Sequence, residues 1–197
     1  MKVVIINSNP QYQRMFQDRG WEVMPVTIEN IKNADLVQFT GGSDVTPALY
    51  GEKNTASDNS EPRDLMEIGV FGVAMAENIP MAGICRGGQF LNVMCGGKMI
   101  QHIEGHATGY THPLFSDSNG DMPRKVAEHV TSTHHQAMVP FDDGCDVLAY
   151  GPDDVAEVIS YPDDKVLCFQ PHPEFGLGEC QDLYFKYLEE LFFSEGG

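Results

Sequence analysis

The cysteine at position 85 lies between two glycines at the end of a short apolar run, in the order G-I-C-R-G. Gly83 and Gly87 complete the pattern G-x-C-x-G, the cysteine counterpart of the G-x-S-x-G elbow, in which small residues let a strained turn expose one reactive side chain. Apolar residues at helical spacing follow, so we expect Cys85 at the N-terminus of a helix. Free backbone N–H groups there would favour a thiolate and could hold an oxyanion. The alternative is an inert core cysteine that precedes a helix.

A second stretch with chemical potential is K-V-L-C-F-Q-P-H-P-E, at residues 165–174. Pro171 and Pro173 flank His172 and keep its backbone out of a helix or a central strand ladder. Glu174 lies two residues further on, which in an extended chain places it on the same side as His172. A nucleophile, an acid–base group and an orienting carboxylate are then available together. An isolated His-Pro-Glu is more often a surface turn, and the co-occurrence with the cysteine elbow favours catalysis instead.

Strands and helices alternate through the first half of the chain, as in an α/β sheet with right-handed crossovers. Strands are predicted at residues 2–7, 21–26, 36–40 and 79–84, and helices at residues 10–18, 63–77 and 88–94. Four later β-type runs follow one another without helices, at residues 126–133, 146–150, 155–161 and 165–169, so at least some of them pair antiparallel. An amphipathic helix at 179–193 closes the sheet. The prediction is one α/β domain, residues 1–197, with a mostly parallel sheet and an antiparallel portion.

The third predicted strand ends in Gly41-Gly42, which permits a tight turn and a close approach of backbone to a ligand. Ligands bind beyond the carboxyl ends of parallel strands, so we expect this turn and Cys85 at one rim of the sheet. Residues 45–62 are predicted to form a surface loop near the site, and residues 101–124 a loop with a short hairpin. Helix 63–77 is expected to bury an apolar face made of Leu65, Ile68, Val70, Val73, Ala74 and Ala76.

Composition limits the classes of partner. The 197 residues carry 12 Lys and Arg against 29 Asp and Glu, a formal charge of −17, which argues against binding to nucleic acid or an anionic membrane surface. An anionic substrate would need local cations, and the Arg86 side chain is the nearest candidate. The five cysteines are odd in number and never form C-x-x-C, so a reducing compartment fits. The N-terminal apolar run is too short for a signal or a membrane span, and we expect a cytoplasmic protein.

Seven histidines prompt a metal hypothesis, because His102 and His106 are four residues apart and His134 and His135 are adjacent. Catalytic zinc sites usually have three well-placed protein ligands, however, and no recognised spacing such as H-E-x-x-H occurs. The sequence therefore predicts no metal site.

Taken together, G-I-C-R-G-G-Q-F-L-N-V and the downstream Q-P-H-P-E resemble the class I glutamine amidotransferase family. More narrowly, they resemble its γ-glutamyl hydrolase branch, peptidase C26, which includes γ-glutamyl-γ-aminobutyrate hydrolase. The similarity covers nearly the whole chain, through T-G-G-S-D-V-T-P-A-L-Y-G-E at 40–52, Arg63-Asp64, Gln101 and S-T-H-H-Q at 132–136. It implies a flavodoxin-like three-layer fold.

The resemblance also implies a catalytic triad of Cys85, His172 and Glu174 that attacks a γ-carboxamide and releases glutamate from a γ-glutamyl thioester. Backbone N–H groups of Gly42 and Arg86 would form the oxyanion hole. The glutamate-like part of the substrate would lie against Gln89, His135 and Gln136. Neither a metal nor an organic cofactor is implied.

Three functions remain open at this point. The first is a stand-alone hydrolase of glutamine or another small γ-glutamyl amide. The second is a glutaminase subunit that passes ammonia to a separate synthetase or ligase, because no synthetase domain is recognisable in the chain. The third is an inactive binding module on the same fold, which would leave the triad unexplained. Residues 107–125 are short compared with the hydrolases, which leaves the leaving-group side of the pocket undefined.

Overall fold

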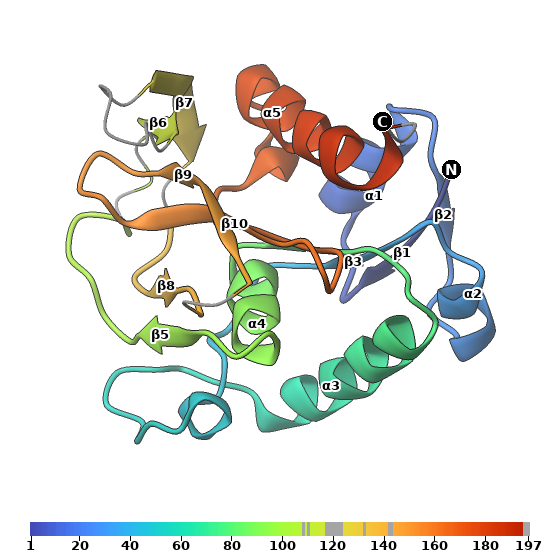
Figure 1. Ribbon diagram of the computed structural model, residues 1–197, viewed down its shortest axis with the longest axis horizontal. Helices are drawn as coiled ribbons and strands as arrows, with labels where there is room; N and C mark the ends of the chain where they lie inside the picture. The colour runs from blue at the N-terminus through green and yellow to red at the C-terminus, as the bar shows by residue number, and fades with distance from the viewer. Residues whose placement is uncertain (108, 110, 117–123, 132, 142–143, 195–197) are drawn as a thin grey trace.

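A nine-stranded sheet forms the middle layer, with helices on both of its faces (Figure 1). The computed structural model describes residues 1–107, 109, 111–116, 124–131, 133–141 and 144–194. The strands of the large sheet are β1 (Lys2–Ile6), β2 (Glu22–Met24), β3 (Leu36–Phe39), β4 (Met81–Ile84), β6 (Thr111–Ser116), β7 (Arg124–Thr131), β9 (Asp146–Tyr150), β10 (Ala156–Tyr161) and β11 (Val166–Phe169). A separate two-stranded sheet joins β5 (Lys98–Ile100) to β8 (Ala137–Val139).

The large sheet has a parallel half and an antiparallel half, in the order β2-β1-β3-β4-β11-β10-β9-β6-β7. The strands from β2 to β11 run parallel to their neighbours. From β11 onward each neighbour is antiparallel. The predicted α/β class with an antiparallel portion is confirmed. Strands β4 and β11 are adjacent, with Ile84 opposite Phe169, so the segments that follow them emerge at the same edge of the sheet.

Helices α1 (Pro10–Gln17) and α5 (Gly178–Leu188) cover one face of the sheet, while α2 (Ile28–Lys32), α3 (Glu61–Ala76) and α4 (Arg86–Met94) cover the other (Figure 1). Short helical turns are η1 (Pro47–Tyr50), η2 (Pro173–Phe175) and η3 (Glu189–Phe193). Val3 packs with the α1 and α5 layer and Val4 with the opposite layer, which explains why β1 is apolar from Val3 to Ile6. Within the described part of the chain, no helix has both the length and the apolar character needed to cross a membrane.

The stretch predicted as loop and hairpin contains a strand of the main sheet. Strand β6 pairs with β7 and, at Phe115, with Tyr150 of β9. Its pairing with β7 shifts register between His112 and Leu114, so Pro113 lies at an irregularity where a missing backbone N–H is tolerated. Pro113 therefore masks a strand that the sequence pattern does not reveal.

The predicted apolar face of α3 is partly wrong. Leu65 is 70% exposed and Ala76 also faces solvent, whereas Asp64 and Glu67 are buried. The two carboxylates turn inward because the buried guanidinium of Arg86 lies on that side. An internal ion pair thus sets the rotation of the helix, against its apolar periodicity.

Candidate active site

Cys85 occupies a strained turn between β4 and α4. Its φ of 51° and ψ of −115° are unusual for a non-glycine residue, and it is the N-cap of α4, as predicted. A Cβ on Gly83 would lie 2.3 Å from the backbone of Gly87, and a Cβ on Gly87 would lie 2.5 Å from the backbone of Phe39. The two glycines are therefore required because α4 packs directly against strands β3 and β4.

His172 and Glu174 follow the neighbouring strand β11 and form a pair. His172 Nδ1 donates to Glu174 Oε1 over 2.6 Å, and the His172 backbone N–H donates to Thr131 Oγ1 over 2.7 Å. The ring of Phe175 stacks on the imidazole, with centroids 4.6 Å apart and planes 7° apart. Glu174 and Phe175 thereby hold the ring at its edge and on its face, while Thr131 holds the backbone. No sequence motif indicates the contribution of Phe175.

The electrostatics of His172 favour its protonated form. Burial by itself would lower the pKa of His172, but its interactions with Cys85 and Glu174 outweigh burial and raise the pKa to about 10. At neutral pH the ring therefore holds a proton that it can give to a leaving group. The interaction with Cys85 joins the elbow to the His172–Glu174 pair.

The Gly41-Gly42 turn lies against both Cys85 and His172. A Cβ on Gly41 would be 3.1 Å from His172 Cε1 and 3.6 Å from Cys85 Cβ, and the Gly41 N–H donates to the Tyr12 hydroxyl over 3.0 Å. Burial, and then the charge of Glu174, raise the pKa of Tyr12, so its phenol stays neutral. Tyr12, on α1, is thus a second residue of the candidate site that no sequence motif indicates.

Arg63 fixes the orientation of the same turn. Its guanidinium donates to the carbonyl oxygens of Thr40 over 2.7 Å and of Gly41 over 3.0 Å. Because C=O and N–H point in opposite directions across a trans peptide, the Gly42 N–H points away from Arg63. A Cβ on Gly42, whose φ is 141°, would lie 2.2 Å from Arg63 Nη1. The role of this N–H in an oxyanion hole stays a prediction.

The Arg86 side chain is not available to a substrate, so its predicted role as a local cation is wrong. It is 1% exposed and forms ion pairs with Asp64 and Glu67, and Glu67 also pairs with Arg63 at 2.9 Å. Burial, followed by the nearby charge of Arg63, lowers the pKa of Arg86 to about 10, which still leaves it charged at neutral pH. Its backbone N–H remains the predicted oxyanion donor.

The predicted substrate-binding residues make protein contacts, and their binding role stays a prediction. Gln89 is buried and its amide donates to Gln170 Oε1 over 3.0 Å. His135 Nε2 lies 3.1 Å from Asp44 Oδ2, while the Gln136 amide donates to Ser57 Oγ over 2.7 Å. Residues 135–136 therefore support the loop that precedes α3. Ser132 and parts of the 107–125 segment lie outside the described residues.

A separate group of histidines could hold a metal ion, contrary to the expectation from sequence. His106, His112 and His134 surround Glu157, and one ligand atom from each lies within 4.8 Å of all the others. His102 and His135, which form part of the closely spaced pairs in the sequence, do not belong to the group. The spacings of 106, 112, 134 and 157 match no recognised motif, so only the fold brings them together.

Residues 23–174 match the family model described as Peptidase C26. A glutamine amidotransferase-like protein of Lactococcus lactis, YvdE, is 32% identical, covering 81% of this chain and 77% of its own. A protein of Mycobacterium tuberculosis named as a glutamine amidotransferase is 37% identical over 72% of this chain, which spans about half (51%) of that relative. The γ-glutamyl-γ-aminobutyrate hydrolase PuuD of Escherichia coli is 28% identical, covering 70% of this chain and 62% of its own.

Solved structures share the fold. PurLQS from Thermotoga maritima aligns with a TM-score of 0.65 at 17% identity, covering 96% of this chain and 98% of its own. A glutamine amidotransferase from the same organism aligns with a TM-score of 0.64 at 16% identity, covering 96% and 84% of the two chains. The three-layer arrangement predicted from the resemblance is thus confirmed.

Proposed function

Because the chain belongs to the peptidase C26 family, we propose that it is a γ-glutamyl amide hydrolase in which Cys85 is the nucleophile. The observation that carries the proposal is the junction at the sheet edge: a strained cysteine at a helix N-terminus beside an imidazole that is hydrogen-bonded to a buried carboxylate. The names of the relatives support the same class, since they describe glutamine amidotransferases and a γ-glutamyl hydrolase.

In the proposed acylation step, Cys85 Sγ attacks the γ-carbonyl carbon and a carbon–sulfur bond forms. The oxyanion is held by N–H groups of Arg86, at the start of α4, and Gly42, whose peptide Arg63 orients. The C–N bond then breaks while His172 Nε2 gives its proton to the leaving nitrogen, so that ammonia or an amine departs. Glu174 holds Nδ1 and stabilises the charged ring until the proton is transferred.

In the proposed deacylation step, His172 takes a proton from water as the water oxygen attacks the thioester carbon. The carbon–sulfur bond breaks, glutamate leaves and Cys85 is regenerated as the thiolate. Phe175, stacked on the imidazole, keeps the ring in one plane through both steps. Every group required lies in the chain itself.

The test is glutamate release by the purified protein alone from L-glutamine and a panel of small γ-glutamyl amines. We expect Cys85→Ala to lower kcat by at least about 10³-fold, as loss of a nucleophile does in other triads. Cys95→Ala is the matched control, because burial raises the pKa of the Cys95 thiol and keeps it unreactive. Activity of Cys85→Ala within tenfold of the unaltered protein would contradict the assignment.

The same assay separates the stand-alone hydrolase from the ammonia-delivering glutaminase subunit. Rapid, Cys85-dependent release from one amine substrate identifies the hydrolase and its leaving group. Slow release from all substrates, together with covalent trapping of Cys85 by a glutamine-analogue electrophile, identifies a glutaminase that needs a synthetase partner. Absence of both turnover and trapping would leave only the binding module.

A further inference from the structure

Three histidines and a glutamate from four separate segments converge in the antiparallel half of the molecule. His112 lies on β6, Glu157 on β10, His106 in the segment before β6, and His134 in the segment before β8. Glu157 is completely buried, and His106 and His134 are also buried. The mechanism proposed above uses none of them, so this cluster needs its own explanation.

The ligand atoms lie close enough to one another to share a single ion, since all of them fall within 4.8 Å. His106 Nδ1 lies 3.1 Å from His134 Nε2 and 3.6 Å from Glu157 Oε1. Glu157 Oε1 lies 3.2 Å from His112 Nε2 and 3.8 Å from His134 Nε2. Four ligands about 2.0–2.1 Å from a zinc ion lie about 3.3–3.4 Å from one another, which falls within the range of these four separations.

One nitrogen of each imidazole faces the cluster, and an outer hydrogen bond holds the ring through its second nitrogen. The other nitrogen of each ring faces an acceptor: His106 Nε2 is 2.8 Å from Asp153 Oδ2, His112 Nδ1 is 3.0 Å from the Pro113 carbonyl, and His134 Nδ1 is 2.8 Å from the Gln136 carbonyl. Such partners are what orient histidine ligands of metal ions.

Glu157 carries the charge that a cation would balance. Neither of its carboxylate oxygens has a well-aligned hydrogen-bond partner among the described residues, although both are buried. His112 Nε2 likewise has no well-aligned hydrogen-bond partner among the described residues, although it lies 3.2 Å from Glu157 Oε1. A buried carboxylate without a full set of partners is costly, and a bound cation would remove that cost.

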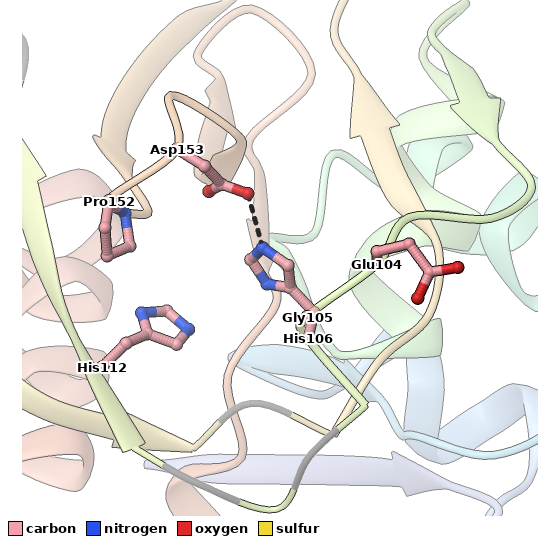
Figure 2. Close-up of a pocket in the computed structure, with 6 residues that line it drawn as sticks. All are labelled: Glu104, Gly105, His106, His112, Pro152 and Asp153. Atoms are coloured by element: carbon pink, nitrogen blue, oxygen red, sulfur yellow. Dashed lines mark hydrogen bonds and ion pairs between the residues drawn. The ribbon is translucent and has the colours of Figure 1, made fainter.

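We propose that His106, His112, His134 and Glu157 bind one divalent transition-metal ion, with Zn²⁺ as the best match. Three imidazoles exclude a hard cation such as Mg²⁺ or Ca²⁺, which prefers oxygen ligands, and a four-ligand protein shell suits a structural ion. A cavity of about 220 Å³, lined in part by His106, His112 and Asp153, gives access from solvent. Figure 2 shows the His106 and His112 rings on either side of this cavity, while the Glu104 carboxylate points away from them.

The ion would fasten the antiparallel half of the sheet to the catalytic edge. Glu157 accepts a backbone hydrogen bond from Gln170 over 2.8 Å, two residues before His172. His134 directly precedes His135 and Gln136, which hold the loop before α3. Metal binding should therefore raise thermal stability, while the chemistry at Cys85 needs no ion.

The test is the binding of Zn²⁺ to full-length protein stripped with a chelator, measured by calorimetry, together with visible absorption after Co²⁺ substitution. We expect one Zn²⁺ per chain, an increase in Tm, and the intense d–d bands of four-coordinate Co²⁺. His112→Gln and Glu157→Gln should each weaken Zn²⁺ binding by at least about tenfold and abolish those bands. Asp153→Asn, which alters only the outer partner of His106, should weaken binding by about 10-fold to 100-fold.

Two controls locate the ion. His129→Gln removes an exposed histidine outside the cluster and should leave Zn²⁺ affinity unchanged. Cys85→Ala should also bind Zn²⁺ normally, and loss of binding in that variant would place the ion at the catalytic centre and overturn the proposal. The proposal also fails if the unaltered protein binds no Zn²⁺ at micromolar concentration, or if folded His112→Gln and Glu157→Gln both bind it with unchanged affinity.

Discussion

Two of the buried carboxylate sites in the structure, one beside Arg86 and one in the antiparallel half, balance their charge in different ways. Next to the Cys85 turn, Asp64 and Glu67 form ion pairs with the guanidinium of Arg86, and Glu67 also pairs with Arg63. In the antiparallel half, the ionisable groups that face Glu157 among the described residues are three imidazoles. A guanidinium stays charged even when burial lowers the pKa of Arg86 to about 10, so the first cluster is complete within the chain. In the second cluster, the charge of Glu157 is balanced only if a metal ion binds or one of the imidazoles takes up a proton.

The His172–Glu174 pair lies between these extremes. Its carboxylate is balanced by a histidine proton, which the interactions with Cys85 and Glu174 retain at neutral pH. The counter-ions of the three carboxylate sites are thus a permanently charged arginine (Arg86), a histidine that can lose its proton (His172) and a proposed metal ion. This ranking predicts how strongly each site responds when its charge is altered.

The largest effect on stability is expected at the ion pairs that Arg86 forms with Asp64 and Glu67. Arg86→Met leaves the Asp64 and Glu67 carboxylates buried without their main counter-ion, and should lower the free energy of unfolding by about 3–5 kcal/mol. Urea unfolding at pH 7 measures this change. Arg124→Met removes an exposed arginine and should alter stability by less than about 0.5 kcal/mol. Equal, small effects of both substitutions would show that the buried network contributes no more than surface charge.

This ranking of the carboxylate sites could not be obtained from the sequence, although the placement of the proposed catalytic residues at one edge of the sheet largely could. The elbow is recognisable as a local motif, although its glycines are needed for different contacts: a Cβ on Gly83 would meet the backbone of Gly87, and a Cβ on Gly87 would meet the backbone of Phe39 on β3. His172 was predictable because its flanking prolines exclude regular structure. Both residues follow adjacent parallel strands, and the β-branched and apolar runs predict those strands.

The remaining features depend on contacts between layers that no local pattern encodes. The hydroxyl of Tyr12, on α1, accepts a hydrogen bond from the Gly41 N–H, although α1 lies on the other face of the sheet from α3 and α4. Asp64 is buried because of Arg86, 22 residues away, whereas periodicity assigns the core position to Leu65. The histidine cluster needs β6, which is hidden in the sequence by Pro113 at a register shift. Such long-range pairings decide which polar residues can be buried.

An intermediate effect on stability is expected at the His172–Glu174 pair. The folded-state pKa of His172, about 10, exceeds its ordinary value of 6.5, so its stabilising contribution is complete below pH 6.5 and is lost as pH rises toward 10. The difference in unfolding free energy between the unaltered protein and His172→Gln should therefore shrink from pH 7 to pH 9.5, by at most about 1.4 kcal/mol per pH unit. Urea titrations of both proteins measure it. A difference that stays constant or grows with pH would contradict a protonated His172.

The smallest effect on stability is expected at Glu157 in protein without a bound metal ion. In chelator-treated protein, Glu157→Gln removes a charge that has no permanent counter-ion, so the free energy of unfolding should change by no more than about 1 kcal/mol. Glu22→Gln, at an exposed glutamate, is the matched control. With Zn²⁺ at 100 times its dissociation constant, only the unaltered chain and the control should gain about 2.7 kcal/mol. A loss above about 3 kcal/mol in metal-free Glu157→Gln would mean that histidine protons already balance Glu157, and the two carboxylate clusters would then be alike.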